Sequence, residues 1–430
     1  MSVLARTLLL LFTTSLLAGC ESSSEFDACV HSDDPSGAAG GRHLACPSSV
    51  FVAEDLRSRE IAGVVRRGED FVPGAIVRVD PSPDFGGVRS TKTISTITNG
   101  VGFFGGLRSV ALRYDLSVKL GEDLLFYRSA ANRYFEPSLE GPRAFSRVFT
   151  SRVDLQLDRA ILEGRSVAFF ANGEGVLTVS GDAASGLAVL HQEYTNPATI
   201  HVVEYETSGG LEKATAYGKV DVVLDPGGVR LASVVLEPVT SFMEPAFSVS
   251  APPGAASPTI EMRLTFSRTS DATLATVPPG TPRKIPVIPN AGYTYRAQAA
   301  LDGATLHSGE AFFDPNRAVT AIELPAPPLV FSPADGEARG AGEALLVDGE
   351  GVFEHVLVPA GGGRTMRIIT RRRDAALPDP TLLGAAPASG PHTWTVRSFP
   401  KVRFAEELSG LDVRRYRAMG VSAPRSIVLR

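Results

Sequence analysis

The chain of 430 residues is long enough for several domains, because one domain typically holds about 150 residues. Its hydrophobic share of 43% and its charged share of 21% are those of a globular protein, which excludes a broadly disordered chain. A net charge of -5 excludes a general electrostatic attraction to nucleic acid, so no nucleic-acid partner is predicted.

Residues 1–19 predict a secretory signal peptide: Arg6 gives a positive start, Leu8–Leu17 is mostly apolar, and two small residues follow. The sequence Leu17-Ala18-Gly19-Cys20 resembles the lipobox of bacterial lipoproteins. This resemblance implies that Cys20 is acylated and anchors the mature chain to a membrane of the cell envelope. Glu21 is similar to the residues that sort such proteins to the outer membrane. Because no later apolar run reaches about eighteen residues, lipid is the predicted anchor.

Residues 20–57 are poor in large apolar side chains and predict a flexible tether, with a Gly-rich stretch at Pro35–Gly41. The sequence contains 3 cysteines. If Cys20 carries lipid, Cys29 and Cys46 remain as an even pair in an oxidising compartment. We therefore expect a disulfide between them.

Residues 58–128 alternate apolar and polar side chains, which predicts strands because successive side chains of a strand point to opposite faces. Asn99-Gly100 lies between two of these strands and predicts a hairpin turn. The segment resembles the carboxypeptidase regulatory-like (transthyretin-like) domain, which implies a small β-sandwich. The pieces that carry the resemblance are the Ile61–Gly63 neighbourhood, Val72–Val77, Thr96–Phe103 and Tyr114–Val118.

Further β-sandwiches are predicted over 147–240, 241–325 and 329–430, because short strands recur there between turns. The last segment contains Trp394 and resembles a fibronectin type III or immunoglobulin-like module. A helix is expected over Phe404–Met419, where apolar residues recur at helical spacing. The predicted fold class is all-β: tandem β-sandwich modules behind a signal peptide and a flexible tether.

His201 and Glu204 have the H-x-x-E spacing of zinc carboxypeptidases, which makes a zinc-dependent hydrolase one alternative function. Residues three apart on a strand point to opposite faces, so both could not bind one metal ion. Another candidate is a tetrahedral zinc set within the tether, formed by Cys29, His31, His43 and Cys46. Export favours the disulfide, so no metal, cofactor or catalytic residue is predicted.

Two other patterns have plain structural explanations. Residues 100–105 match G-x-G-x-x-G, but a dinucleotide site needs a helix after this turn, and a strand is expected instead. A basic cluster offers a patch for acidic polysaccharide or lipid headgroups, although a solvated turn is the simpler interpretation. Its members are Arg364, Arg367, Arg371, Arg372 and Arg373.

With no catalytic signature, the sequence favours a non-enzymatic, lipid-anchored envelope protein that acts as a binding or scaffolding module array. Exposed loops or edge strands would bind an envelope protein or polysaccharide partner. The alternative is a carbohydrate-binding envelope lipoprotein, which would need a planar array of exposed aromatic side chains. The chain has only 1 Trp and 9 Tyr, and such an array is not visible in its sequence.

Overall fold

The structure is a computed structural model in which strands and three short 3-10 helices are described. The predicted all-β fold class is therefore confirmed. The predicted signal peptide and tether, with Cys20, Cys29 and Cys46, lie outside the described residues. Within those residues, no helix is long and apolar enough to span a membrane. The described ranges are 59–67, 70–81, 94–109, 113–132, 134–139, 149–173, 177–182, 184–191, 197–267, 270–314, 319–362, 365–385, 389–409 and 417–430.

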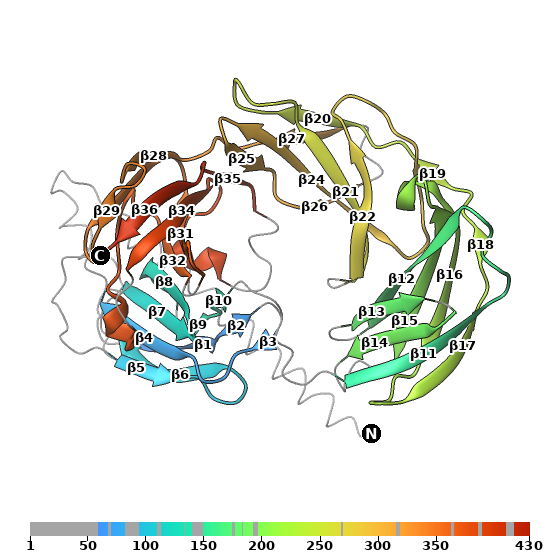
Figure 1. Ribbon diagram of the computed structural model, residues 1–430, viewed down its shortest axis with the longest axis horizontal. Coiled ribbons are helices and arrows are strands. Elements are labelled where there is room, and N and C mark those ends of the chain that lie inside the picture. Colours follow the sequence, from blue (N-terminus) through green and yellow to red (C-terminus); the bar gives the residue numbers. More distant parts are fainter. Residues whose placement is uncertain are drawn as a thin grey trace, which may run out of the picture. The chain divides into compact units, whose positions relative to one another are not determined.

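The first described strands divide between three sheets (Figure 1). Their bounds are β1 Arg59–Val64, β2 Arg66–Arg67, β3 Asp70–Phe71, β4 Ile76–Pro81, β5 Ile94–Ile97, β6 Phe103–Ser109, β7 Tyr114–Leu120, β8 Asp123–Ala130, β9 Tyr134–Phe135 and β10 Ser138–Leu139. Two sheets have the orders β6-β1-β9 and β10-β2-β3, while β5, β4, β7 and β8 are antiparallel neighbours in the third. β8 then pairs in parallel with β32 (Met366–Thr370), so the third sheet continues into the C-terminal part of the chain.

The predicted hairpin at Asn99-Gly100 is wrong, because the strands on its two sides enter different sheets: β5 pairs with β4, whereas β6 pairs with β1. The turn itself is tight, since the Asn99 amide donates to the Phe103 carbonyl at 2.9 Å. Beyond the turn Phe104 is 1% exposed, whereas Ile97 on the other side is 64% exposed. Burial of Phe104 in the opposite layer therefore outweighs the pairing of the two adjacent strands.

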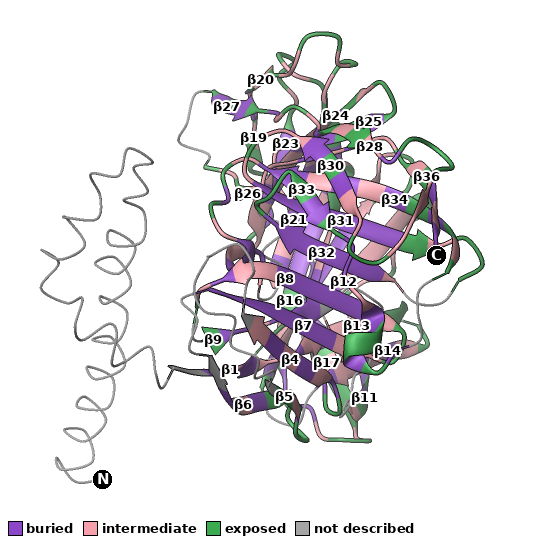
Figure 2. Ribbon diagram, turned by 90° about the vertical axis from the view of Figure 1, so that its left-hand side faces the viewer, coloured by how far each residue is buried: buried purple, intermediate pink, exposed green. Residues whose placement is uncertain are grey.

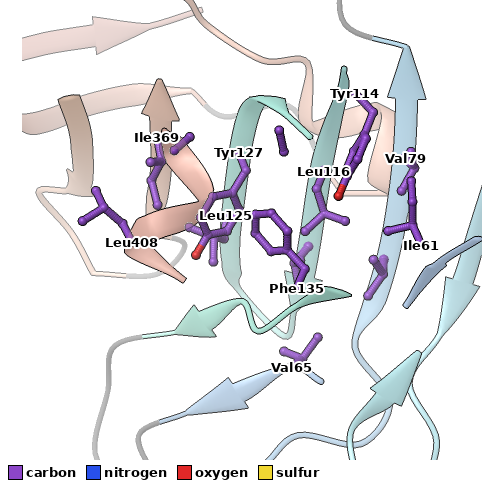
Figure 3. Close-up of a cluster of buried hydrophobic side chains, with 14 of the residues drawn as sticks. Ile61, Val65, Val79, Tyr114, Leu116, Leu125, Tyr127, Phe135, Ile369 and Leu408 are labelled. Atoms are coloured by element: carbon purple, nitrogen blue, oxygen red, sulfur yellow. The ribbon is translucent and has the colours of Figure 1, made fainter. Parts of the chain in front are cut away.

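A core cluster joins the first sheets to the C-terminal part of the chain. Figure 3 shows Tyr127 and Phe135 within it, with ring centroids 4.6 Å apart and planes at 78°, an edge-to-face contact. Ile369 and Leu408 belong to the same cluster. Gly63 is required beside it, because a Cβ there would lie 1.8 Å from the Phe135 carbonyl oxygen. This close approach explains why the Ile61–Gly63 piece has a glycine at position 63.

The next part of the chain is a two-sheet sandwich. Its elements are β11 Phe149–Leu157, β12 Arg165–Gly173, β13 Leu177–Asp182, β14 Gly186–His191, β15 Ala198–Glu206, η1 Gly210–Lys213, β16 Ala214–Val222, β17 Val229–Val234 and β18 Glu237–Pro238. The sheets have the orders β13-β14-β11-β17 and β12-β15-β16-β18, and Val153, Leu187 and Val202 pack between them.

The third group of strands packs on the other face of the β12-β15-β16 sheet, where Phe170 and Val203 join their core. Their bounds are β19 Phe242–Met243, β20 Phe247–Ser250, β21 Thr259–Ser267, β22 Ser270–Val277, β23 Ile285–Pro286, β24 Gly292–Leu301, β25 Ala304–His307, β26 Ala311–Phe312 and β27 Thr320–Glu323. β22, β21, β24 and β25 are successive antiparallel neighbours, and β20 pairs with β27 in parallel.

The last group contains the buried Trp394, which is 1% exposed and belongs to a separate core cluster. Its elements are β28 Leu329–Ser332, β29 Ala338–Arg339, β30 Ala344–Asp348, β31 Val352–Pro359, β33 Asp374–Ala376, η2 Pro380–Leu383, β34 Gly390–Phe399, η3 Ala405–Leu408, β35 Met419–Val421 and β36 Arg425–Leu429. β35, β34, β31, β32, β8 and β7 follow one another in one sheet, and Figure 2 colours β31, β32, β8 and β7 largely as buried.

The helix expected over Phe404–Met419 is wrong at both of its described ends. Only Ala405–Leu408 is helical there, as one 3-10 turn, and Ser409 after it is extended. Met419 begins β35, where it pairs with His307 of β25. Residues 410–416 lie outside the described ranges. Sheet pairing at Met419 therefore overrides the helical spacing of the apolar side chains.

Candidate functional site

His201 and Glu204 lie on β15 and point in opposite directions, as predicted. The His201 ring stacks on Phe266, with centroids 4.1 Å apart. The Glu204 carboxylate forms ion pairs with Arg159 at 2.7 Å and with Arg165 at 2.5 Å. The two side chains therefore do not come together as metal ligands. Among the described residues, no group of three or more His, Cys, Asp or Glu side chains is arranged to hold a metal ion.

The protonation of both groups follows from their surroundings. Burial, reinforced by the charge of Lys219, lowers the pKa of His201 to about 4, so its imidazole is neutral at physiological pH. Burial by itself would raise the pKa of Glu204, but hydrogen bonds from Arg159, Thr215 and Arg165 together hold that pKa below its ordinary value. The result is a neutral histidine on one face of β15 and an ion-paired carboxylate on the other.

Sequence reasoning missed a serine–histidine pair, because the two residues are 40 apart in the chain. The register of β11 and β14 places Ser151 opposite Val189, which brings His191 diagonally beside it. The Ser151 Oγ lies 2.8 Å from His191 Nε2 and donates to the Asp225 carbonyl at 2.5 Å. Since the hydroxyl has one proton, His191 Nε2 must donate to Ser151 Oγ. This polarity is opposite to that of a serine activated by a histidine base, and the pair is structural.

The remaining sequence patterns also have structural positions. Residues 100–105 lead into β6, a strand, so the helix of a dinucleotide site does not follow them. In the basic cluster, Arg372 and Arg373 are exposed and pair with neighbouring aspartates. Arg367 instead is 8% exposed and pairs with the buried Glu354 at 3.2 Å, so the solvated-turn interpretation is wrong for this residue. Arg364 lies outside the described residues.

A small cleft lies beside the C-terminus, between Arg339, Leu377, Asp379 and Leu429. Its volume is about 40 Å³, enough for one or a few water molecules. Sites for drug-sized ligands typically have volumes of about 300–1,000 Å³. This cleft therefore does not support binding of a sizeable small-molecule substrate.

The strongest candidate binding surface is the free edge of β17. Among the described strands, β17 is the last of its sheet and pairs with β11 alone, in parallel, from Arg152 opposite Val229 to Leu157 opposite Val234 (Figure 1). The Arg152 amide donates to the Gly228 carbonyl at 2.8 Å, which determines which residues of β17 face β11. Backbone groups alternate in direction along a strand.

It follows that Arg230, Ala232 and Val234 direct their N–H and C=O groups to β11. The backbone groups of Val229, Leu231 and Ser233 point to the open side. No strand in the described part of the chain pairs with this side. The edge therefore offers a row of three donors and three acceptors.

Apolar side chains accompany these backbone groups. Val229 is 62% exposed and Leu231 is 77% exposed, while Val234 at the other end of the strand is 1% exposed in the core. The charge of Arg230 is paired with Asp225. Exposed apolar side chains beside unpaired backbone groups are the combination that promotes strand addition.

Two other sheet edges within the described residues are covered by side chains. At the β12 edge, the Ala171 amide donates to Ser270 Oγ at 2.8 Å, and Ser267 Oγ donates to the Ala171 carbonyl at 3.1 Å. At the β28 edge, Arg425 donates to the Val330 carbonyl at 2.6 Å. Among the described residues, no such side-chain hydrogen bond to the open backbone groups of β17 occurs. The sequence predicted a β-sandwich over 147–240 but contains no signal that identifies the open side of β17.

Exposed aromatic side chains bear on the carbohydrate alternative. Those of the described residues are divided among β6, β9, β19, β26 and β28. They are Phe103, Tyr134, Phe242, Phe312 and Phe331. Because each stands on a different strand, they do not form a row along one strand that a sugar chain could follow.

No protein-family model and no curated protein matches this chain. Among solved structures it is similar to the TIE protein of Bacillus anthracis (11% identity, 62% of this chain and 50% of that chain, TM-score 0.13). It is also similar to the major pilin subunit of Bacillus cereus (9%, 62%, 98%, TM-score 0.12) and to the tetra-tandem repeat of a large adhesion protein (10%, 86%, 99%, TM-score 0.15). The chain spans half the length of the first of these. Because these TM-scores are low, no function is transferred from them.

Proposed function

We propose that this chain is a non-enzymatic, lipid-anchored protein of the bacterial cell envelope that binds its partner by strand addition to β17. The observation that carries the proposal is the free edge, with its open backbone groups at Val229, Leu231 and Ser233 and its two exposed apolar side chains. Main-chain hydrogen bonds to an added strand supply affinity, and the flanking side chains supply specificity.

The environment of the candidate catalytic groups supports the non-enzymatic part of the proposal. Glu204 is paired with two arginines, His201 stacks on Phe266 and hydrogen-bonds the Tyr217 hydroxyl, and Ser151 donates its proton away from His191. The resemblance of Leu17–Cys20 to a lipobox supports the envelope location, and Glu21 supports the outer membrane.

The edge is tested by site-specific photo-crosslinking on intact cells. A photoreactive amino acid at Leu231 is expected to give one discrete crosslinked product, because this side chain would lie at the centre of the added strand. The matched control is Phe312, which is 71% exposed on β26, away from this edge, and is expected to give no such product. Equal products at both positions, or none at Leu231, would contradict the proposal.

The anchor is tested by metabolic labelling with a fatty acid. We expect Cys20→Ala to remove the label and to release the chain from the membrane fraction, because several acyl chains at about 0.8 kcal/mol per buried CH₂ would hold it there. Cys29→Ala is the control, since this cysteine is assigned to a disulfide with Cys46, and it should keep its label. Undiminished labelling of Cys20→Ala would end the lipoprotein proposal.

A further inference from the structure

We infer that the strand added to β17 is β17 of a second copy of this chain, in an antiparallel, two-fold symmetric pairing centred on Leu231. This inference rests on the proposed function, because it names the partner of the same edge. It commits to a homodimer whose interface is formed by one surface used twice.

The positions of the open backbone groups are self-complementary. They occur at Val229, Leu231 and Ser233, and they are therefore symmetric about Leu231. In an antiparallel ladder, two opposite residues of a hydrogen-bonded pair exchange both N–H···O=C bonds. With Leu231 opposite its copy, each Val229 lies opposite a Ser233 of the other strand. All open groups of both edges then find partners without any change in the fold.

Charge and packing select this register over its neighbours. A shift that centres the pairing on Arg230 would place two like charges directly opposite, which is destabilising. A shift that centres it on Ala232 would place Val229 opposite Val235, which lies beyond the end of β17 and whose carbonyl faces Gly218 of β16, where an added Cβ would lie 2.4 Å from that oxygen. In the register centred on Leu231, each Arg230 lies opposite Ala232.

The same register gathers the exposed apolar side chains. Val229, Leu231 and Ser233 point to the outer face of the sheet, so the two Leu231 side chains would meet at the two-fold axis. On the adjacent β11, the outward charges Arg152 and Asp154 already form an ion pair at 2.6 Å, so pairing adds no uncompensated charge. The sheet would continue through both copies in the order β13-β14-β11-β17-β17-β11-β14-β13.

The size of this contact makes the dimer a weak, concentration-dependent one, because interfaces limited to a short segment bury little surface. A shared membrane anchor would compensate by raising the effective concentration of one copy for the other. The pairing is therefore expected mainly among anchored copies.

A charge-exchange experiment tests the symmetry directly. Two differently tagged full-length copies are co-expressed, crosslinked chemically in the intact membrane and then purified through one tag, and recovery of the second tag reports pairing among anchored copies. Wild-type copies should co-purify. Two Leu231→Lys copies, and two Leu231→Glu copies, should show at least about tenfold less recovery because like charges face each other at the axis. A Leu231→Lys copy with a Leu231→Glu copy should restore recovery. Phe312→Lys, on β26, is the matched control and should co-purify like wild type.

The outcomes separate this inference from the proposed function. Wild-type copies that do not co-purify, Leu231→Lys copies that still do, or a mixed pair that is not rescued would overturn the homodimer. If the Leu231 photo-crosslink then joins the chain to a different protein, the binding edge stands and only its occupant changes. If the crosslink is also absent, both proposals fail.

Discussion

Glu354→Ala is expected to lower the free energy of unfolding by about 3–5 kcal/mol, because it removes the counter-charge of a buried arginine. Glu354 on β31 is 0% exposed and lies 3.2 Å from Arg367 on β32 and 3.2 Å from Arg397 on β34. Breaking a buried pair from one side leaves a charge that water reaches poorly. Chemical denaturation of the variant and the wild type measures the difference.

The control is Asp374→Ala, which breaks the exposed ion pair with Arg372 at 2.7 Å. Exposed pairs are worth about 0–1 kcal/mol, so this variant should unfold almost like wild type. Replacing both buried partners, in Glu354→Leu with Arg367→Met, should recover part of the loss, because the arginine that remains, Arg397, has a side chain that is 25% exposed and reached by water. Equal effects of Glu354→Ala and Asp374→Ala would show that the buried charge does not determine the loss.

The positions of strands were largely predictable, whereas their partners were not. Alternation of apolar and polar side chains located β7 within a few residues, since it depends only on neighbouring positions: the piece Tyr114–Val118 lies within Tyr114–Leu120. The pairing of β8 with β32 joins residues about 240 apart, and no local pattern encodes it. The turn at Asn99 was recognised, but the separation of its strands depends on where Phe104 is buried.

The candidate site shows the same division. Local spacing correctly predicted that His201 and Glu204 face opposite sides of a strand, because that follows from strand geometry alone. Which side of β17 is open depends on its pairing with β11, and the Ser151–His191 contact depends on the register between β11 and β14. Both are tertiary properties. An exposed Leu231 is noticeable only once the sheet order is known.

Acidification from pH 7 to pH 4 is expected to destabilise the fold strongly, because two buried histidines and one half-buried histidine stay neutral in it. Burial lowers the pKa of His201 and of His307 to about 4, and that of His355 to about 3, from an ordinary 6.5. Below pH 6.5 the unfolded chain binds protons that the folded chain does not, so stability falls as the pH falls toward these folded values. The loss is roughly 3 kcal/mol for each histidine.

Glu406 opposes this trend, because burial raises its pKa and its neutral form is favoured in the fold. Its contribution weakens the fold as the pH rises above 4.5, so Glu406→Gln should steepen the rise of stability between pH 5 and pH 7.

His355 stacks parallel to Trp394 with centroids 5.9 Å apart, and His355→Phe should preserve this contact while it removes one titrating group. Unfolding free energies at pH 7, 6 and 5 should then show a shallower slope for His355→Phe. A slope equal to that of wild type would mean that His355 does not remain neutral in the folded protein.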